Sequence, residues 1–374
     1  MSLADLLKAG GRTLLGRASC PAPCQLTPES PDSRDALAAI EELSQAVRND
    51  PDAVEIYLAL GNLYRLRGDI DRAIQIRNSL IVRPGLDNRF RARAYLELGR
   101  DYRRAGFVDR ALHAFGEARR LGADASALDL ETAQLHADSG NFEEAAPLFG
   151  KLGHSLGQAH YMVRHAEDLI ARGDLPTARK LLARAVKIYP GSAEAWTARI
   201  IIAINAGEWR KVRTRLREAL EQVAPEIRFL VLEGVMALPV PDAPDDSAQA
   251  FEERRCDAVL SALESQEPDL LLTYYGALFH LRCANREAAS NWLARAMILK
   301  PDFWAARLEL LAISMGAQDL SPAFRPQLEY FIEQARHVNR FVCTACGLRR
   351  EQPFHICPRC RSWHSARFRL SLQD

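Results

Sequence analysis

Residues 57–76, YLALGNLYRLRGDIDRAIQI, are repeated in altered form by residues 95–115, YLELGRDYRRAGFVDRALHAF. Both stretches carry a tyrosine, a leucine–glycine pair, a second tyrosine, a turn glycine and an alanine at the same spacing. Counted from Gly106, further turn glycines follow at positions 140, 173 and 207, at intervals of 34, 33 and 34 residues. A nearly fixed period of this length predicts a stacked array of helix–turn–helix units.

The spacing resembles the tetratricopeptide repeat, in which an aromatic residue, a Leu-Gly pair, a tyrosine, an alanine and a phenylalanine recur. Small residues on the two helices of a hairpin let their backbones approach, and aromatic residues fill the space between units. One hairpin cannot bury its own apolar face, so neighbouring hairpins stack and supply the missing contacts. We therefore predict an all-α fold, a superhelical α-solenoid over residues 36–336, preceded by an N-terminal segment and linker at residues 1–35.

Three stretches depart from the plain repeat. Residues 35–49 are predicted to form a lone second helix at the start of the array, and residues 239–248, PVPDAPDDSA, an acidic loop. Gly276, Ala288 and Trp292 restore the pattern after degenerate units. Residues 196–205, WTARIIIAIN, are apolar almost all round, which predicts cover from something beyond the neighbouring repeats.

The composition is that of a folded, soluble chain. With 49 Lys and Arg against 48 Asp and Glu, the net charge of +1 excludes a chain that binds nucleic acid or anionic membrane through its overall charge. No apolar run is long enough to span a membrane, and residues 1–20 lack the apolar core of a secretory signal. We expect a cytoplasmic protein whose membrane contact is at most peripheral, through a short basic amphipathic segment near the N-terminus.

Polar side chains on the predicted first helices point into the groove of the array. Arginines at this face could clamp a carboxylate or an acidic peptide segment, or they could be ordinary solvated surface charge. The candidate partner-binding residues are Asn62, Arg65, Arg100, Arg103 and Arg104.

The C-terminus carries the clearest chemical signal. Cys343-Thr-Ala-Cys346 and Cys357-Pro-Arg-Cys360 are two C-x2-C motifs separated by ten residues. Each motif turns two thiolates inward, and two motifs supply the four sulfurs of a tetrahedral metal site. Gly347 permits a turn that a side chain would oppose. We predict one metal ion, with zinc favoured over iron, in a rubredoxin-like or zinc-ribbon module at residues 338–374.

Two other functions are weighed against a scaffold. Residues 338–374 hold seven arginines, two acids and interleaved aromatic side chains, so a zinc-ribbon nucleic-acid-binding protein is one alternative. Aromatic residues around a small metal site more often form its core, however. A rubredoxin-type electron carrier is the other alternative. The common nucleotide-binding and hydrolase motifs are absent from the sequence, so we do not expect an enzyme.

A repeat array followed directly by this four-cysteine module resembles the lipopolysaccharide assembly protein B family of Gram-negative bacteria. The resemblance is carried by residues 60–76, by residues 98–112 and by the tail FVCTACGLRREQPFHICPRCRSW at residues 341–363. It implies that Cys343, Cys346, Cys357 and Cys360 are the metal ligands and that the module packs against the repeats.

The resemblance also implies a non-enzymatic adaptor at the cytoplasmic face of the inner membrane. Such an adaptor helps the membrane-bound AAA+ zinc protease FtsH degrade the deacetylase that commits precursor to lipid A, and so limits lipopolysaccharide synthesis. Family members have a transmembrane anchor and a complete first repeat, and residues 1–35 show neither.

Overall fold

The computed structural model describes residues 38–46, 53–241 and 245–371. The expected N-terminal segment and linker, with its amphipathic stretch, lies outside these residues. The described chain forms two compact units that meet at His165 and Ala166, and each is treated by itself.

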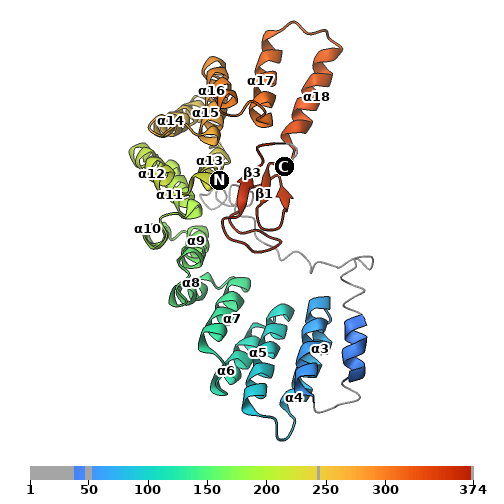
Figure 1. Ribbon diagram of the computed structural model, residues 1–374. Coiled ribbons are helices and arrows are strands. Elements are labelled where there is room, and N and C mark those ends of the chain that lie inside the picture. The colour runs from blue at the N-terminus through green and yellow to red at the C-terminus, as the bar shows by residue number, and fades with distance from the viewer. Residues whose placement is uncertain (1–37, 47–52, 242–244, 372–374) are drawn as a thin grey trace. The chain divides into compact units, whose positions relative to one another are not determined.

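The N-terminal unit is built of antiparallel helix pairs (Figure 1). Residues 38–46 are helical, which confirms the described part of the helix expected at residues 35–49. The following helices are α3 (Val54–Arg67), α4 (Ile70–Ile81), α5 (Asn88–Ala105), α6 (Val108–Arg120), α7 (Ala125–Asp138) and α8 (Phe142–Lys151), and α9 (Ser155–Ala171) crosses the unit boundary.

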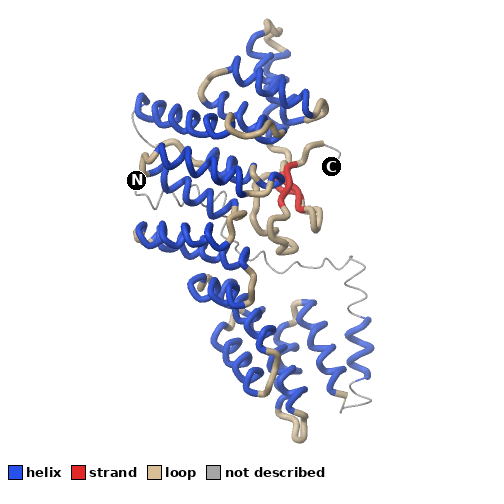
Figure 2. The backbone as a smooth tube through the Cα atoms, turned by 60° about the vertical axis from the view of Figure 1, so that its left-hand side comes forward, coloured by secondary structure: helices blue, strands red, loops and turns tan. Residues whose placement is uncertain are grey.

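The C-terminal unit continues the helix pairs and ends in a small sheet. Its helices are α10 (Leu175–Ile188), α11 (Ala193–Asn205), α12 (Trp209–Gln222), the short 3-10 helix η1 (Pro225–Ile227), α13 (Phe229–Met236), α14 (Asp245–Leu263), α15 (Leu270–Arg282), α16 (Arg286–Leu299), α17 (Trp304–Ala317) and α18 (Phe324–Arg336). The strands are β1 (Phe341–Cys343), β2 (Arg349–Arg350) and β3 (Ala366–Phe368). Figure 2 shows the strands in red against the helices of this unit.

The predicted turn glycines end the first helices of their hairpins. Gly106 has a φ of +81°, and its N–H donates to Arg103 O at 3.1 Å, while the N–H of Phe107 donates to Tyr102 O at 2.9 Å. This is the left-handed helix end that glycine adopts without steric cost. Positive φ values recur at the other predicted turn glycines, Gly68, Gly140, Gly173 and Gly207.

The small residues bring the two helices of each hairpin together, as predicted. Ala111 is fully buried, and a Cβ atom added to Gly99 would lie 2.3 Å from Cε1 of the Phe115 ring. Gly276 approaches the Trp292 ring in the same way, although Ala289 rather than Ala288 is the fully buried alanine of that hairpin.

Substitution of Gly99 tests this close approach. We expect Gly99→Ala to lower the free energy of unfolding by about 1–3 kcal/mol, because the new methyl group overlaps the Phe115 ring. Gly116→Ala is the matched control, since Gly116 lies in α6 with open space beside it and should gain about 0.5–1 kcal/mol from better helix propensity. Chemical denaturation measures both variants, and equal stabilities would contradict the packing.

Two expectations for the later repeats are corrected. The apolar helix α11 is covered by α13, the α-helix that follows α12 in the chain, and a Cβ atom on Gly234 would lie 2.2 Å from Cγ2 of Thr197. Helix α13 is itself buried almost along its whole length. The segment expected as a loop at residues 239–248 already becomes helical at Asp245, where α14 begins.

Candidate metal centre

The cysteine module is built on a three-stranded antiparallel sheet with the order β2-β1-β3. Phe341 pairs with Phe368 and Cys343 with Ala366 across β1 and β3. Strand β1 therefore ends at the first cysteine, and the sheet fixes where the first C-x2-C turn begins.

The two C-x2-C turns have the same backbone geometry. In the first, the N–H of Gly347 donates to Cys343 O at 2.9 Å, and in the second the N–H of Arg361 donates to Cys357 O at 2.9 Å. Both residues have positive φ, +70° for Gly347 and +58° for Arg361. The requirement predicted at Gly347 is confirmed, and the second turn meets it with an arginine, which the sequence analysis did not single out.

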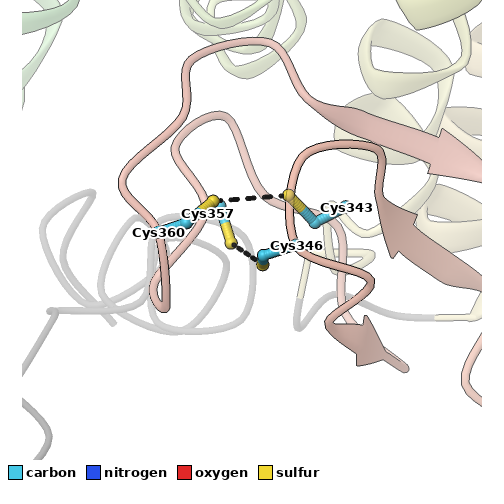
Figure 3. Close-up of side chains that lie close together, drawn as sticks. All are labelled: Cys343, Cys346, Cys357 and Cys360. Carbon is cyan, nitrogen blue, oxygen red and sulfur yellow. Dashed lines mark hydrogen bonds between the residues drawn. The ribbon is translucent and has the colours of Figure 1, made fainter.

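The four sulfurs converge on one point (Figure 3). The Sγ atoms of Cys343 and Cys360 are 3.6 Å apart, as are those of Cys346 and Cys357, and all four lie within 4.8 Å of one another. Sulfurs bound tetrahedrally at about 2.3 Å from a zinc ion are separated by about 3.8 Å. The observed separations therefore fit a single four-coordinate metal ion.

Backbone N–H groups point at the sulfurs in a pattern that repeats between the turns. Cys343 Sγ is approached by the N–H groups of Ala345 and Cys346, and Cys357 by those at the same offsets in its own turn. Burial alone would raise the pKa of Cys343, but these N–H groups and the Ser365 hydroxyl bring it down to about 6. Such donors favour the thiolate, which is the form that binds metal. At Cys357 burial outweighs the same donors and raises the pKa to about 12. The donor set thus fits the metal that the sequence predicts.

Aromatic side chains join the module to the helices of the C-terminal unit. The Phe341 ring stacks on Phe229 at 5.6 Å between centroids, and Phe368 lies 5.8 Å from both Tyr274 and Phe303. Phe341 and Phe368 were expected to form the module's own core. They instead belong to a cluster shared with α13, α15 and the N-terminal end of α17.

Polar contacts surround this shared cluster. The indole N–H of Trp304 donates to Arg369 O at 2.8 Å, and Arg340 lies 3.7 Å from Glu233 Oε1, which also accepts the Tyr275 hydroxyl at 2.5 Å. Glu233 raises the pKa of Arg340 against the lowering effect of burial. The module is therefore docked on the repeats, as the resemblance implies, at a face that includes Trp304.

The candidate partner-binding arginines lie in the N-terminal unit, where acids already pair with them. Arg65 contacts Glu97 at 2.7 Å and Asp101 at 2.8 Å. Arg77 is fully buried and lies 3.5 Å from the same Asp101. Its guanidinium packs against Gly61, in the way that the Phe115 ring packs against Gly99 in the next repeat. Burial raises the pKa of Asp101 to about 6, although both arginines act to lower it.

The same network continues into the next repeat. Arg100 bridges Glu97 at 2.6 Å and Glu131 at 2.7 Å, and Arg103 contacts Glu131 at 2.8 Å. Asn62 accepts hydrogen bonds from the guanidinium groups of the neighbouring arginines, whereas Arg104 is exposed. The structure thus brings four of the five candidates into one ion-pair network and leaves Arg104 outside it. Their role in partner binding stays a prediction.

The fold and the cysteine cluster define a tetratricopeptide-repeat protein with a small zinc-ribbon-like module. A family model described as "Tetratricopeptide repeat" matches residues 32–83 and 96–152, and a second of the same description matches residues 160–202. Such repeats make this chain a protein-interaction adaptor.

Among curated proteins, the chain is similar to "Lipopolysaccharide assembly protein B" of Escherichia coli strain K12. The two are 25% identical over 334 residues, which are 87% of this chain and 83% of the relative, and the protein of strain O157:H7 matches with the same values. The chain is thus a tetratricopeptide-repeat protein resembling lipopolysaccharide assembly protein B.

Two solved structures are similar to this chain at lower sequence identity. The tetratricopeptide repeat protein YrrB is 18% identical, with 71% of this chain and 96% of that chain covered and a TM-score of 0.23. A tetratricopeptide repeat protein from Parabacteroides merdae is 14% identical, with 74% and 99% covered and a TM-score of 0.32.

Within residues 38–46, 53–241 and 245–371, no helix is both long and apolar enough to cross a bilayer.

Proposed function

We propose that this chain is a non-enzymatic adaptor that regulates lipopolysaccharide assembly. The observation that carries the proposal is the similarity to lipopolysaccharide assembly protein B, which extends over 87% of this chain. The convergence of four cysteines beside a repeat array supports it, because that combination is what the sequence resemblance rests on.

In this proposal Cys343, Cys346, Cys357 and Cys360 hold one structural zinc ion. Zinc closes a four-sulfur site without a redox role, and its binding energy is folding energy for a module too small to have a core of its own. The module's aromatic side chains then complete the apolar surface that α13 and α15 present. The metal thereby supports the shape of the C-terminal repeats.

The proposed partners are a membrane-bound AAA+ protease and the deacetylase of the lipid A pathway. The adaptor would act in the cytoplasm, at the face of the inner membrane, and bring the deacetylase to the protease. Tetratricopeptide repeats favour such a role, since stacked hairpins offer an extended concave surface to a second protein.

Affinity purification of the tagged full chain from its native cells tests the proposal. We expect the protease and the deacetylase to copurify, and we expect the deacetylase to persist several-fold longer in cells that lack the adaptor. A tagged Cys357→Ser chain serves as the matched control. Absence of both proteins from the eluate, with an unchanged deacetylase lifetime, would exclude this function.

A further inference from the structure

A basic depression lies on α11 and α12, away from the cysteine cluster and outside the ion-pair network of the N-terminal unit. Its volume is about 270 Å³. It is lined by Arg199, Arg210, Lys211, Thr214, Arg215 and Glu218.

Arg199 and Arg215 are half-buried side by side at the base of this depression. The Arg199 guanidinium lies 5.0 Å from the centroid of the Trp196 ring, and Nη1 of Arg215 donates to Arg199 O at 2.7 Å. An aromatic ring face and a carbonyl oxygen hold guanidinium groups in place but do not neutralise their positive charge. Among the described residues, no carboxylate oxygen lies within 4 Å of either guanidinium, in contrast to Arg65 and Arg100.

The environment of the two guanidiniums opposes their charge. Burial lowers the pKa of Arg199, and burial followed by repulsion from Arg199 lowers the pKa of Arg215. Two acids offset this in part. Glu218, which lines the depression, acts to raise the pKa of both arginines, and Glu208, which acts on Arg215, is shared with Arg179 at 3.1 Å and Lys211 at 3.2 Å. An anion that entered the depression would therefore relieve repulsion as well as form charge-assisted hydrogen bonds.

The separation of the cations along the axis of α12 bears on which kind of anion fits the depression. Arg210 and Arg215 are five residues apart on α12, which corresponds to about 7.5 Å along the helix axis. Cations at different heights along the helix can each bind a different carboxylate of one chain. Side chains two residues apart on one face of an extended peptide are separated by about 6.6 Å, so an acidic segment can place successive carboxylates at both positions.

We propose that the depression on α11 and α12 docks an acidic segment of a partner protein, with Arg199, Arg210 and Arg215 binding its carboxylates. This inference rests on the adaptor function proposed above and names the chemistry of one partner surface. It places the acidic-peptide site three repeats beyond the last of the arginines that the sequence singled out.

The test uses a fluorescein-labelled hexaglutamate peptide and the purified full chain at low ionic strength. We expect anisotropy to show saturable binding to the wild-type chain, no binding of labelled hexaglutamine, and at least a tenfold weaker affinity for R199Q/R215Q. Arg217→Gln is the matched control, because Arg217 is exposed on the same helix and does not line the depression. Thermal melts of each variant check that the fold is retained.

Four outcomes would overturn the proposal. The first two are an unchanged affinity in a folded R199Q/R215Q chain and an equal loss in Arg217→Gln. The third is displacement of hexaglutamate by inorganic phosphate but not by chloride of equal ionic strength, which would indicate a site for a single oxyanion. The fourth is capture of the wild-type chain, but not R199Q/R215Q, by phosphatidylglycerol vesicles, which would indicate a membrane surface. Peptide binding is measured without the protease or the deacetylase, so its failure is distinguishable from failure of the adaptor function.

Discussion

Replacing Cys357 by serine is expected to abolish stoichiometric metal binding and to unfold the C-terminal module. Cys357 is fully buried, and its sulfur lies 3.6 Å from that of Cys346. Three sulfurs leave one coordination position open. A structural zinc site of four ligands contributes on the order of 10 kcal/mol of apparent binding energy, much of it available only to the folded module.

Metal analysis of the purified chain measures this effect directly. We expect one metal ion per wild-type chain and a substoichiometric amount in Cys357→Ser, together with a lowered melting temperature. Cys283→Ser is the control, since it removes a half-buried thiol that lies outside the cluster. Full metal content and an unchanged melting curve in Cys357→Ser would place the metal elsewhere.

The same preparation distinguishes the two candidate metals. Iron bound by four thiolates gives a coloured and redox-active protein, whereas zinc gives a colourless one. A coloured protein whose iron can be reduced and reoxidised would favour the electron-carrier alternative over a structural site.

The repeats could be predicted from sequence because their packing imposes local requirements. A left-handed turn selects glycine, as at Gly106, and close helix approach selects small residues, as at Gly99 and Ala111. These requirements recur with each repeat, so they leave a period in the sequence. The two C-x2-C motifs are equally local, and their spacing anticipated the convergence of all four sulfurs.

The charge network was missed although the period could have revealed it. Arg65 pairs with Glu97 and Asp101, which follow it by 32 and 36 residues, close to one repeat. A comparison of each arginine with the acids one repeat onward would reveal these pairs. Arg77 stands 16 residues after Gly61, as Phe115 does after Gly99, so the same comparison would have identified a charged residue at an aromatic position.

The face of the repeats on which the cysteine module docks could not be predicted from the spacing of residues in the sequence. The Trp304 indole reaches Arg369 O across 65 residues, and Phe229 meets Phe341 across an even longer stretch of sequence. Contacts of this kind depend on where the array carries the chain in space. The family resemblance implied that the module packs against the repeats, and only the structure gave the location.

Phe368 is the centre of that docking face, and its removal is expected to release the module from the repeats. Its ring lies within 6.5 Å of the rings of six other residues, and its exposed fraction is 5%. The six are Phe229, Tyr274, Tyr275, Phe303, Trp304 and Phe341. Truncation of such a buried ring to alanine costs about 3–5 kcal/mol.

Hydrogen exchange of the metal-loaded Phe368→Ala chain measures where this energy is lost. We expect protection to fall in α13 and α15 as well as in residues 341–371, because the cluster rests on Phe229, Tyr274 and Tyr275. Helices α5 and α6 of the N-terminal unit should keep their protection and serve as an internal reference. Phe331→Ala is the matched variant, since Phe331 is 64% exposed on α18 and its loss should change stability by less than about 0.5 kcal/mol.

Removal of the metal should reproduce the pattern of Phe368→Ala if the metal supports the repeats through this cluster. The four sulfurs fix the turns that follow β1 and precede β3, and these two strands carry Phe341 and Phe368. Loss of the metal therefore frees both rings at once, and exchange in α13 and α15 should rise with chelator in the wild-type chain. Chelator should add little in Phe368→Ala, because the contact through which the metal acts is already missing. A chelator effect confined to residues 338–371 of the wild-type chain would show that the module folds on its metal without supporting the array.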